Sequence, residues 1–297
     1  MSILYDSLRC YKQIELTHEN KIKYFLEQHS TKEGTWGQLI LNSGAIDFIF
    51  LNGEGQELSK VSLDNTNKQI KFPPACLHKI VQNSKEFSAT LKFYCMPHRY
   101  FNKKHKLGHI HSDLLYISNN YLKNAGKLNV LDIGCGSGRN IFHYAAEGHH
   151  VMGVDINSKA LESINAIAIQ EKINNIKTRV HDLNNSLELN DEMFDLIVAT
   201  VSLQFLNAER IPVLLKEMQQ HTRAKGLHFL VFPIDSPEFN LPESFTYLPQ
   251  KDEIYHYYQD AGWGVLEYNE KVGNLHRLDE LGKPIQGKFG LILAQKH

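Results

Sequence analysis

The sequence predicts an α/β protein built on a Rossmann-like sheet of seven strands, with an all-β domain in front of it. Three observations lead to this fold class. Apolar and polar residues alternate with a period of two, broken by turn residues, from about residue 10 to residue 97. Strand-like and helix-like stretches then alternate to the end of the chain. A glycine-rich loop follows the first of these later strands and precedes a helix.

The composition is that of an ordinary folded protein, 42% hydrophobic and 22% charged over 297 residues. Lys plus Arg is 32 against 33 for Asp plus Glu, and no basic stripe interleaved with aromatic residues indicates a nucleic-acid partner. No apolar run approaches the roughly 18 residues that a membrane span needs. We therefore expect a small-molecule partner, no nucleic acid and no membrane; association into a homo-oligomer is left open.

Cysteine usage and the first residues of the chain bear on the cellular compartment. The four cysteines form no C-x-x-C pair and no regular framework: Cys10, Cys76, Cys95 and Cys135. That usage is typical of a reducing compartment. Residues 1–12 carry Asp6, Arg9 and Lys12 and lack the apolar core of a signal peptide. We therefore expect a cytoplasmic protein.

Residues 1–97 are expected to form the all-β domain. The clearest strand-like stretches and turns are strands at 36–41, 45–51 and 91–95 and turns at 42–44 and 52–55. The turn sequences Asn-Ser-Gly and Asn-Gly-Glu-Gly between apolar runs are typical of a β-meander. The domain is expected to be a sandwich or a cupin-like half-barrel.

Histidines in this part of the chain raise the question of a metal. His78 follows a Phe-Pro-Pro sequence at a place where a cupin-like barrel can hold a metal, but a cupin site needs several His and Glu ligands. His109 and His111 have H-x-H spacing without nearby Cys or acidic partners that complete a ligand set. We predict no metal.

Residues 98–110 are polar and basic and are expected to be a linker, followed by the second domain at 111–297. The expected parallel strands are 128–133, 150–156, 176–183, 194–200 and 227–234. The expected helices between them are 140–148, 158–172 and 209–222. Strands at 265–268 and 288–294 have no helix between them and are therefore expected to be antiparallel.

The most informative stretch is residues 130–140, Val-Leu-Asp-Ile-Gly-Cys-Gly-Ser-Gly-Arg-Asn. Gly134 and Gly136 allow a sharp turn and let a ligand approach the backbone closely. Asp155 ends the next strand 21 positions after Gly134, where a carboxylate can accept hydrogen bonds from ribose hydroxyls. Asp182 ends the third strand, where a carboxylate can accept a hydrogen bond from the adenine amine. Together they indicate an adenosine-containing ligand at the carboxyl edge of the sheet.

The loop also distinguishes between adenosine cofactors. It lacks the third glycine position of a dinucleotide loop, since Arg139 stands three residues after Gly136. Asp132, next to the loop, suits a ligand that carries an ammonium and a sulfonium. We therefore prefer S-adenosylmethionine to NAD, and the alternative is a glycine loop that only packs a helix on a strand.

At these residues the chain resembles the tellurite-resistance methyltransferases, the TehB family, and so the class I methyltransferase sheet. The matching pieces are residues 131–140, 178–185, 200–206 and 268–277, and in the N-terminal part 10–13, 35–37, 93–95 and 100–101. The glycine loop is shared by many methyltransferases. The stretch 268–277, Tyr-Asn-Glu-Lys-Val-Gly-Asn-Leu-His-Arg, is much more diagnostic.

The resemblance implies transfer of a methyl group from S-adenosylmethionine to tellurite and to selenite, which would confer tellurite resistance as a response to a toxic substance. By position, the cofactor-binding residues are Asp132, Gly134, Gly136, Arg139, Asn140, Asp155, Ile156, Asp182, Leu183, Thr200 and Val201. His276 and Arg277 resemble the residues on the acceptor side and are the catalytic candidates with Lys283.

Two positions depart from the family pattern. Pro284 stands where the family tends to show an arginine, with Lys283 beside it as a possible replacement for the charge, and His105 stands where the family shows a tyrosine. These departures keep two alternatives open. One is a methyltransferase for a small organic thiol or thiopurine, and the other is a cofactor-binding sensor without turnover.

Overall fold

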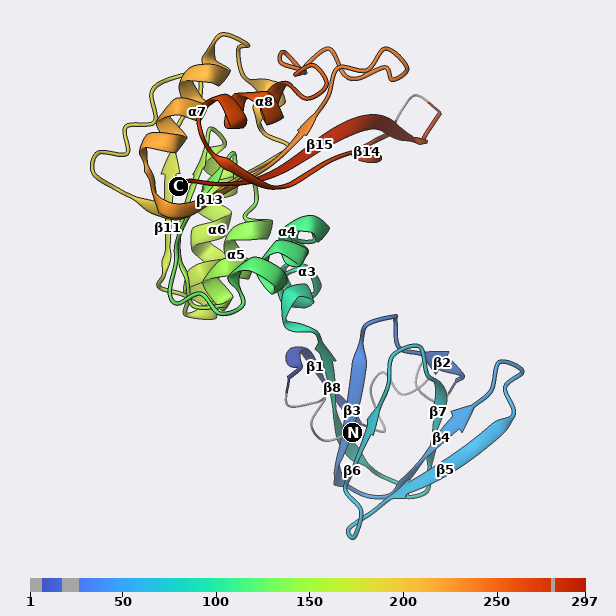
Figure 1. Cartoon of the computed structure of the whole chain (residues 1–297). Coiled ribbons are helices and arrows are strands. Elements are labelled where there is room, and N and C mark those ends of the chain that lie inside the picture. The colour runs from blue at the N-terminus through green and yellow to red at the C-terminus, as the bar shows by residue number, and fades with distance from the viewer. Residues whose placement is uncertain (1–6, 18–26, 279–280) are drawn as a thin grey trace. The chain divides into compact units, whose positions relative to one another are not determined.

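The computed structural model describes residues 7–17, 27–278 and 281–297, and the side chains of residues 276 and 277 lie outside that description. The chain divides into two compact units, Met1–Lys106 and Leu107–His297. Figure 1 shows the strands of the first unit and the helices and strands of the second. Each unit is built around its own core.

The N-terminal unit is a sandwich of two four-stranded sheets. Their orders are β1-β8-β3-β6 and β2-β7-β4-β5, and each pair of neighbours whose register is defined is antiparallel. The strands are β1 (Arg9–Thr17), β2 (His29–Ser30), β3 (Trp36–Ser43), β4 (Ile46–Leu51), β5 (Glu57–Leu63), β6 (Gln69–Phe72), β7 (Leu77–Gln82) and β8 (Ser88–Cys95). The prediction of an all-β N-terminal region is confirmed.

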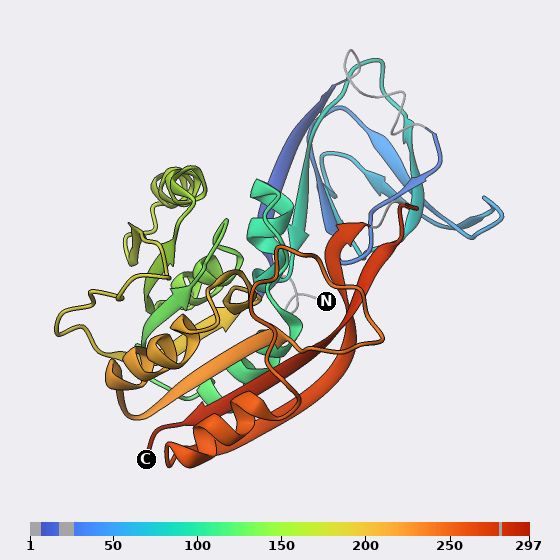
Figure 2. The same cartoon turned by 90° about the horizontal axis from the view of Figure 1, so that it is seen from above.

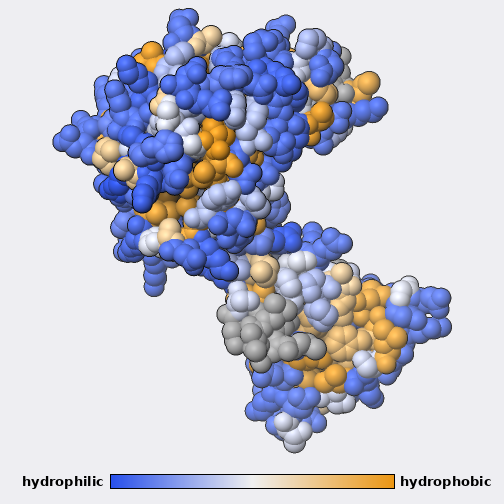
Figure 3. Space-filling view, in the orientation of Figure 1, coloured by the Kyte–Doolittle hydropathy of each residue, from blue (hydrophilic) through white to orange (hydrophobic). Residues whose placement is uncertain are grey.

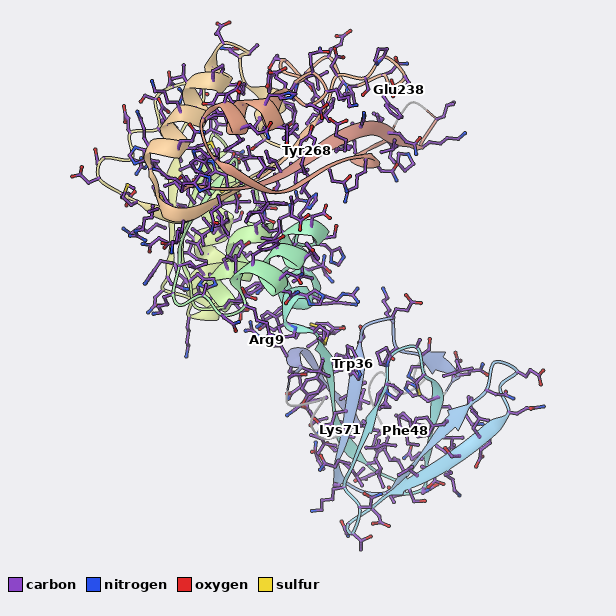
Figure 4. All side chains as sticks on the ribbon, viewed as in Figure 1. Arg9, Trp36, Phe48, Lys71, Glu238 and Tyr268 are labelled. Carbon is purple, nitrogen blue, oxygen red and sulfur yellow. The ribbon has the colours of Figure 1, made fainter. Side chains whose placement is uncertain are left out.

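The core of this unit is formed by inward-facing residues of both sheets. Leu39 and Leu91 come from the first sheet, and Phe48 and Ile80 from the second; each is at most 3% exposed. Figure 4 labels Phe48 on its strand, and Figure 3 shows apolar side chains gathered over the middle of the unit with polar ones around them. Alternation along each strand thus places one row of side chains between the sheets.

The segment expected as a linker contains regular structure. A short 3₁₀ turn, η1 (Pro97–Arg99), leads into α3 (Tyr100–His105). The many basic residues suggested a linker, but Tyr100 and Phe101 are buried, and the Arg9 guanidinium lies 3.9 Å from the centre of the Tyr100 ring. A cation over an aromatic face is attractive, so this helix is held against β1.

The C-terminal unit is a seven-stranded sheet in the order β11-β10-β9-β12-β13-β15-β14. The strands are β9 (Asn129–Ile133), β10 (His150–Asp155), β11 (Ile176–Val180), β12 (Phe194–Thr200), β13 (Thr222–Pro233), β14 (Gly264–Leu278) and β15 (Pro284–Gln295). The first five are parallel, and β15 pairs antiparallel with both β13 and β14. This confirms the predicted fold class.

Helices cover both faces of this sheet (Figure 1). They are α4 (Ser112–Ile117), α5 (Arg139–Ala146), α6 (Ser158–Glu171), α7 (Arg210–Gln220) and α8 (Glu253–Asp260). On one face lie α5 and α6, and on the other lie α7 and α8. No helix among the described residues is both long and apolar enough to cross a bilayer.

Helix α8 was not predicted from the sequence. Its inner face is aromatic: Tyr258 is fully buried and its hydroxyl lies 2.6 Å from Nδ1 of His228 on β13. The ring of Tyr255 lies 5.0 Å from that of Tyr268 on β14, which Figure 4 labels. Aromatic residues are weak helix formers, so packing against the sheet, rather than local preference, stabilises this helix.

Strand β14 is much longer than the predicted stretch 265–268. Pro233, near the end of β13, pairs with Phe289, so residues 284–288 of β15 and their partners on β14 continue past the carboxyl end of β13. Figure 2 shows this hairpin extending beyond the rest of the sheet. The hairpin therefore extends on the side where the five parallel strands end.

A buried histidine should make the N-terminal unit sensitive to acid. His78 is 2% exposed, stacks on Phe48 and has a pKa lowered by burial to about 4. Because the folded state holds this histidine neutral, its contribution to stability is complete above about pH 6.5 and is lost as the pH falls towards 4. We expect the thermal midpoint of this unit to fall over that window, and His78→Leu to flatten the dependence.

The two tryptophans allow the thermal midpoint of the N-terminal unit to be measured in the whole chain. Trp36 lies in the N-terminal unit and Trp263 in the C-terminal unit. In a Trp263→Phe background, fluorescence therefore reports the N-terminal unit alone. An equal pH dependence with and without His78→Leu would show that another group is responsible.

Candidate active site

The glycine loop joins β9 to α5 and is fastened to the neighbouring strand. Gly134 has φ +67°, and the amides of Gly134 and Cys135 both donate to the Val154 carbonyl, at 2.9 and 3.1 Å. The Gly136 amide donates to Oδ2 of Asp155 at 2.7 Å. The loop and the acid predicted from the spacing are therefore in direct contact, and the loop is held in place by the protein itself.

The ends of β10 and β11 carry four of the predicted residues. The other carboxylate oxygen of Asp155, Oδ1, accepts from the Asn157 amide at 2.8 Å, and Ile156 beside it is 67% exposed. Asp182 and Leu183 follow β11, and Oδ1 of Asp182 accepts from the Asn184 amide at 2.9 Å. Since β11, β10 and β9 are parallel neighbours, these residues lie along one edge of the sheet.

Asp132, on β9, is the most unusual group of the site. Its side chain is 2% exposed, and neither carboxylate oxygen has a hydrogen-bond partner among the described residues. Burial raises its pKa to about 7, although the charge of Arg139 and the side-chain amide of Asn140 act to lower it. Burying a carboxylate without partners is costly, so this position is suited to a cationic ligand that completes the site.

The first residues of α5 are joined to the end of β12. Nδ2 of Asn140 donates to Oγ1 of Thr200 at 3.0 Å, and Nη2 of Arg139 lies 3.4 Å from the same oxygen. Val201, the next residue, has φ +58°. A β-branched residue in this region is strained, and such strain is concentrated at functional sites.

A small cavity opens beside these residues. Its volume is about 200 Å³, and its lining includes Arg139 and Val201 together with His111, Asp113 and Lys271. Lys271 lies on β14, and Asp113 lies in the first turn of α4. Sequence reasoning missed Asp113 and Lys271 and considered His111 only as a metal ligand, because residues 158 positions apart share no local pattern.

Of the three catalytic candidates, two lie close in sequence to the lining of this cavity and the third lines a different opening. His276 and Arg277 lie in strand β14, three and four positions after Gly273 of the cavity lining. Lys283 is exposed and immediately precedes β15. It lines a separate opening with Pro284 and Glu238. Hydrogen bonds thus join Gly136 to Asp155, and Asn140 to Thr200, among the candidates for the cofactor site. The three catalytic candidates share only the β14–β15 hairpin.

A larger cavity, of about 600 Å³, lies at the opposite edge of the sheet. Its lining includes Asn129, His150 and Phe194, which begin β9, β10 and β12. None of the predicted site residues lines it. In open α/β sheets ligands bind outside the carboxyl ends of the strands, so the smaller cavity is the better candidate.

The residues at the carboxyl edge fit S-adenosylmethionine. Asp132 is a buried carboxylate that needs a cationic partner, and a Cβ built on Gly136 would have no atom within 4 Å. The loop therefore leaves open space that a ligand can fill next to a negative group. A seven-stranded sheet with this loop and an acid at the end of the second strand defines an S-adenosylmethionine-dependent methyltransferase.

Comparisons with known proteins agree with this assignment and identify the family. The family described as "Tellurite resistance protein TehB" matches residues 93–293, and the "TehB-like domain" matches residues 12–91. The chain belongs to the TehB family. It is 35% identical over 293 residues to the "Probable S-adenosyl-L-methionine-dependent methyltransferase TehB" of Haemophilus influenzae (strain 10810), covering 98% of this chain and 99% of that protein.

Two further similarities extend over nearly the whole chain. "Hemagglutinin 1" of Eikenella corrodens is 31% identical over 293 residues, covering 97% of this chain and 93% of that protein. The crystal structure of TehB from Haemophilus influenzae superposes with a TM-score of 0.90 at 34% identity, covering 99% of this chain and 100% of that one. Both units of the protein therefore occur together in this relative.

Proposed function

We propose that this methyltransferase methylates tellurite, and also selenite, and so confers resistance to tellurite in the cytoplasm. The observation that carries the proposal is the small cavity between the glycine-loop side and β14, which Arg139 and Lys271 both line. A pocket for a drug-sized molecule measures about 300–1,000 Å³, so a cavity of about 200 Å³ favours a small acceptor. Two cationic side chains favour an anion. The four free cysteines suit a reducing compartment.

The cofactor-side roles follow from the geometry of the edge. The Asp132 carboxylate would hold the cationic end of S-adenosylmethionine, and the Asp155 carboxylate would accept from its ribose. Exposed Ile156 would cover one face of the adenine, with Asp182 and Leu183 at its edge. The residues that would line the methyl-donor side are Arg139, Asn140, Thr200 and Val201.

The cofactor supplies a methyl group on a positively charged sulfur, which needs no further activation. With tellurite as the acceptor, the lone pair on tellurium would form a bond to the methyl carbon while the carbon–sulfur bond breaks, and that electron pair would stay on sulfur. No proton has to move in this step. The protein therefore contributes chiefly by holding the acceptor in line, which can supply roughly 7–11 kcal/mol.

His276 and Arg277 are proposed to hold the tellurite oxygens, with Lys283 in the place of the family arginine. We expect Arg277→Ala to lower kcat/KM for tellurite by about 100-fold, because a truncated charged contact costs roughly 2–5 kcal/mol. His276→Ala should lower it by about tenfold, as the loss of a neutral hydrogen bond does. Binding of S-adenosylhomocysteine, measured by calorimetry, should stay within twofold. Unchanged tellurite turnover in both variants would exclude these roles.

The deciding assay is production of S-adenosylhomocysteine by purified protein with tellurite, selenite or a small thiol as the acceptor. Tellurite-dependent formation of S-adenosylhomocysteine, with methylated tellurium detected in solution by mass spectrometry, is the expected result. Pro284, in place of the family arginine, favours a thiol as the second candidate. Turnover with thiols alone would support that candidate, and cofactor binding without turnover on any acceptor would indicate a sensor.

A further inference from the structure

A single carboxylate organises the charged groups of the acceptor cavity. Nζ of Lys271 donates to both oxygens of Asp113, at 2.8 and 3.0 Å. Nδ1 of His111 lies 3.6 Å from Oδ2 of the same residue. Asp113 thus stands between two nitrogen-bearing side chains, and all three line the cavity.

The ion pair gives Lys271 a defined position. Its side chain is 49% exposed and that of Asp113 is 24% exposed, so the pair lies at the surface of the cavity rather than inside the core. An exposed pair of this kind contributes little to stability. Its effect is to restrict a long flexible side chain to one location, at the end of the cavity formed by β14 and α4.

The backbone register fixes what Lys271 can reach. Lys271 pairs with Phe289 on β15, and Phe289 in turn pairs with Pro233 near the carboxyl end of β13. Along the strand direction, Lys271 therefore lies at the carboxyl edge of the parallel strands. Val201 and Arg139 line the same cavity at that edge. Lys271 and Arg139 are thus two cationic residues that line one small cavity, together with the Asp113 carboxylate.

We propose that Lys271, held by Asp113, binds the anionic acceptor in this cavity and makes the site selective for small oxyanions over neutral acceptors. This role deepens the proposed function and rests on it. Lys271 contacts the acceptor, whereas Asp113 is a positioning residue that acts through Lys271. An ammonium contact to an oxyanion strengthens binding without changing the chemistry of the donor.

Four variants test this. Lys271→Met removes the charge and keeps the length of the side chain, and Lys271→Arg restores a cation. Asp113→Asn removes the charged partner of Lys271. Lys216→Met, at an exposed position of α7, is the matched control for loss of one lysine charge in the same unit.

The kinetic readout is the separation of KM from kcat. We expect Lys271→Met to raise KM for tellurite and selenite by about tenfold, with kcat within threefold. Lys271→Arg should restore most of the affinity, and Asp113→Asn should raise KM by a smaller factor. KM for a neutral thiol, Kd for S-adenosylhomocysteine and all constants of Lys216→Met should stay within twofold of those of the unmodified protein.

An equilibrium measurement separates failure of this inference from failure of the proposed function. Selenite is titrated by calorimetry into the protein saturated with S-adenosylhomocysteine, and Lys271→Met should weaken its binding about tenfold. If the unmodified protein turns over no oxyanion, the proposed function is wrong, whereas Lys271-dependent selenite binding still supports the inference. Equal KM and equal selenite Kd in Lys271→Met and the unmodified protein would overturn it, as would undetectable selenite binding.

Discussion

Asp132→Asn should weaken S-adenosylmethionine binding by about 30- to 1,000-fold while making the ligand-free protein more stable at pH 8. Removal of one member of a buried charged contact costs roughly 2–4 kcal/mol, and each tenfold change in affinity corresponds to about 1.4 kcal/mol. The carboxylate has no hydrogen-bond partner in the part of the chain that the structure describes. The lost interaction would therefore be the one made with the cationic ligand.

The gain in stability follows from the raised pKa. Asp132 titrates with a pKa of about 7 in the folded protein against 3.8 ordinarily, so the folded state binds the proton more tightly than the unfolded state. Stability is then lost as the pH rises from about 4 to 7. The amide in the Asp132→Asn variant carries no charge at any pH. The variant should match the unmodified protein below pH 4 and exceed it by roughly 2–4 kcal/mol at pH 8.

Urea unfolding and calorimetric binding between pH 5 and 8 test both effects. Cofactor affinity of the unmodified protein should rise with pH through about 7 as Asp132 ionises, and binding at pH 6 should release protons. Asp191→Asn at an exposed position is the control. A stability curve for Asp132→Asn that runs parallel to that of the unmodified protein would show that this carboxyl titrates normally.

Gly134→Ala should unfold the C-terminal unit at a temperature roughly 5–15 °C lower. A Cβ at this position would lie 2.4 Å from Cβ of Ser202, which is 8% exposed and hydrogen-bonded through its hydroxyl to the Ile133 carbonyl at 2.9 Å. The φ of +67° adds the cost of a left-handed alanine, about 1–2 kcal/mol. Crowding and strain together should cost roughly 2–4 kcal/mol.

Substitutions at two other glycines distinguish the effect of crowding from the effects of backbone strain and of a blocked ligand site. Gly136 and Gly148 have φ +53° and +92°, and a Cβ on either would have no atom within 4 Å. Gly148→Ala should lower the stability only by the cost of backbone strain, and it should bind cofactor normally. Gly136→Ala should lose a similar amount of stability but also weaken cofactor binding at least tenfold, since its Cβ would fill ligand space. In a Trp36→Phe background, thermal unfolding followed by Trp263 fluorescence measures the stability of the C-terminal unit. Calorimetry measures cofactor binding. Equal losses for all three variants would exclude crowding at Gly134.

Local patterns along the chain suffice to predict much of the C-terminal sheet. The five parallel strands, the antiparallel pair after them and the position of Asp155 at the end of the second strand were all expected. Each rests on a pattern within a short window, such as a period of two or a loop between a strand and a helix. Errors were concentrated where packing outweighs local preference. Tyr258 stabilises α8 from inside the core, and Tyr100 turns a basic stretch into a helix.

The sequence by itself determined the order of the elements, the glycine-rich loop and the residues that follow each strand, because these depend on neighbours along the chain. The tertiary structure alone decided that Asp132 is buried with no hydrogen-bond partner among the described residues, and that β14 continues past the sheet edge. It also decided that Lys271 meets Asp113 across 158 positions. Burial and long-range pairing depend on which surfaces come together, and no local periodicity encodes that.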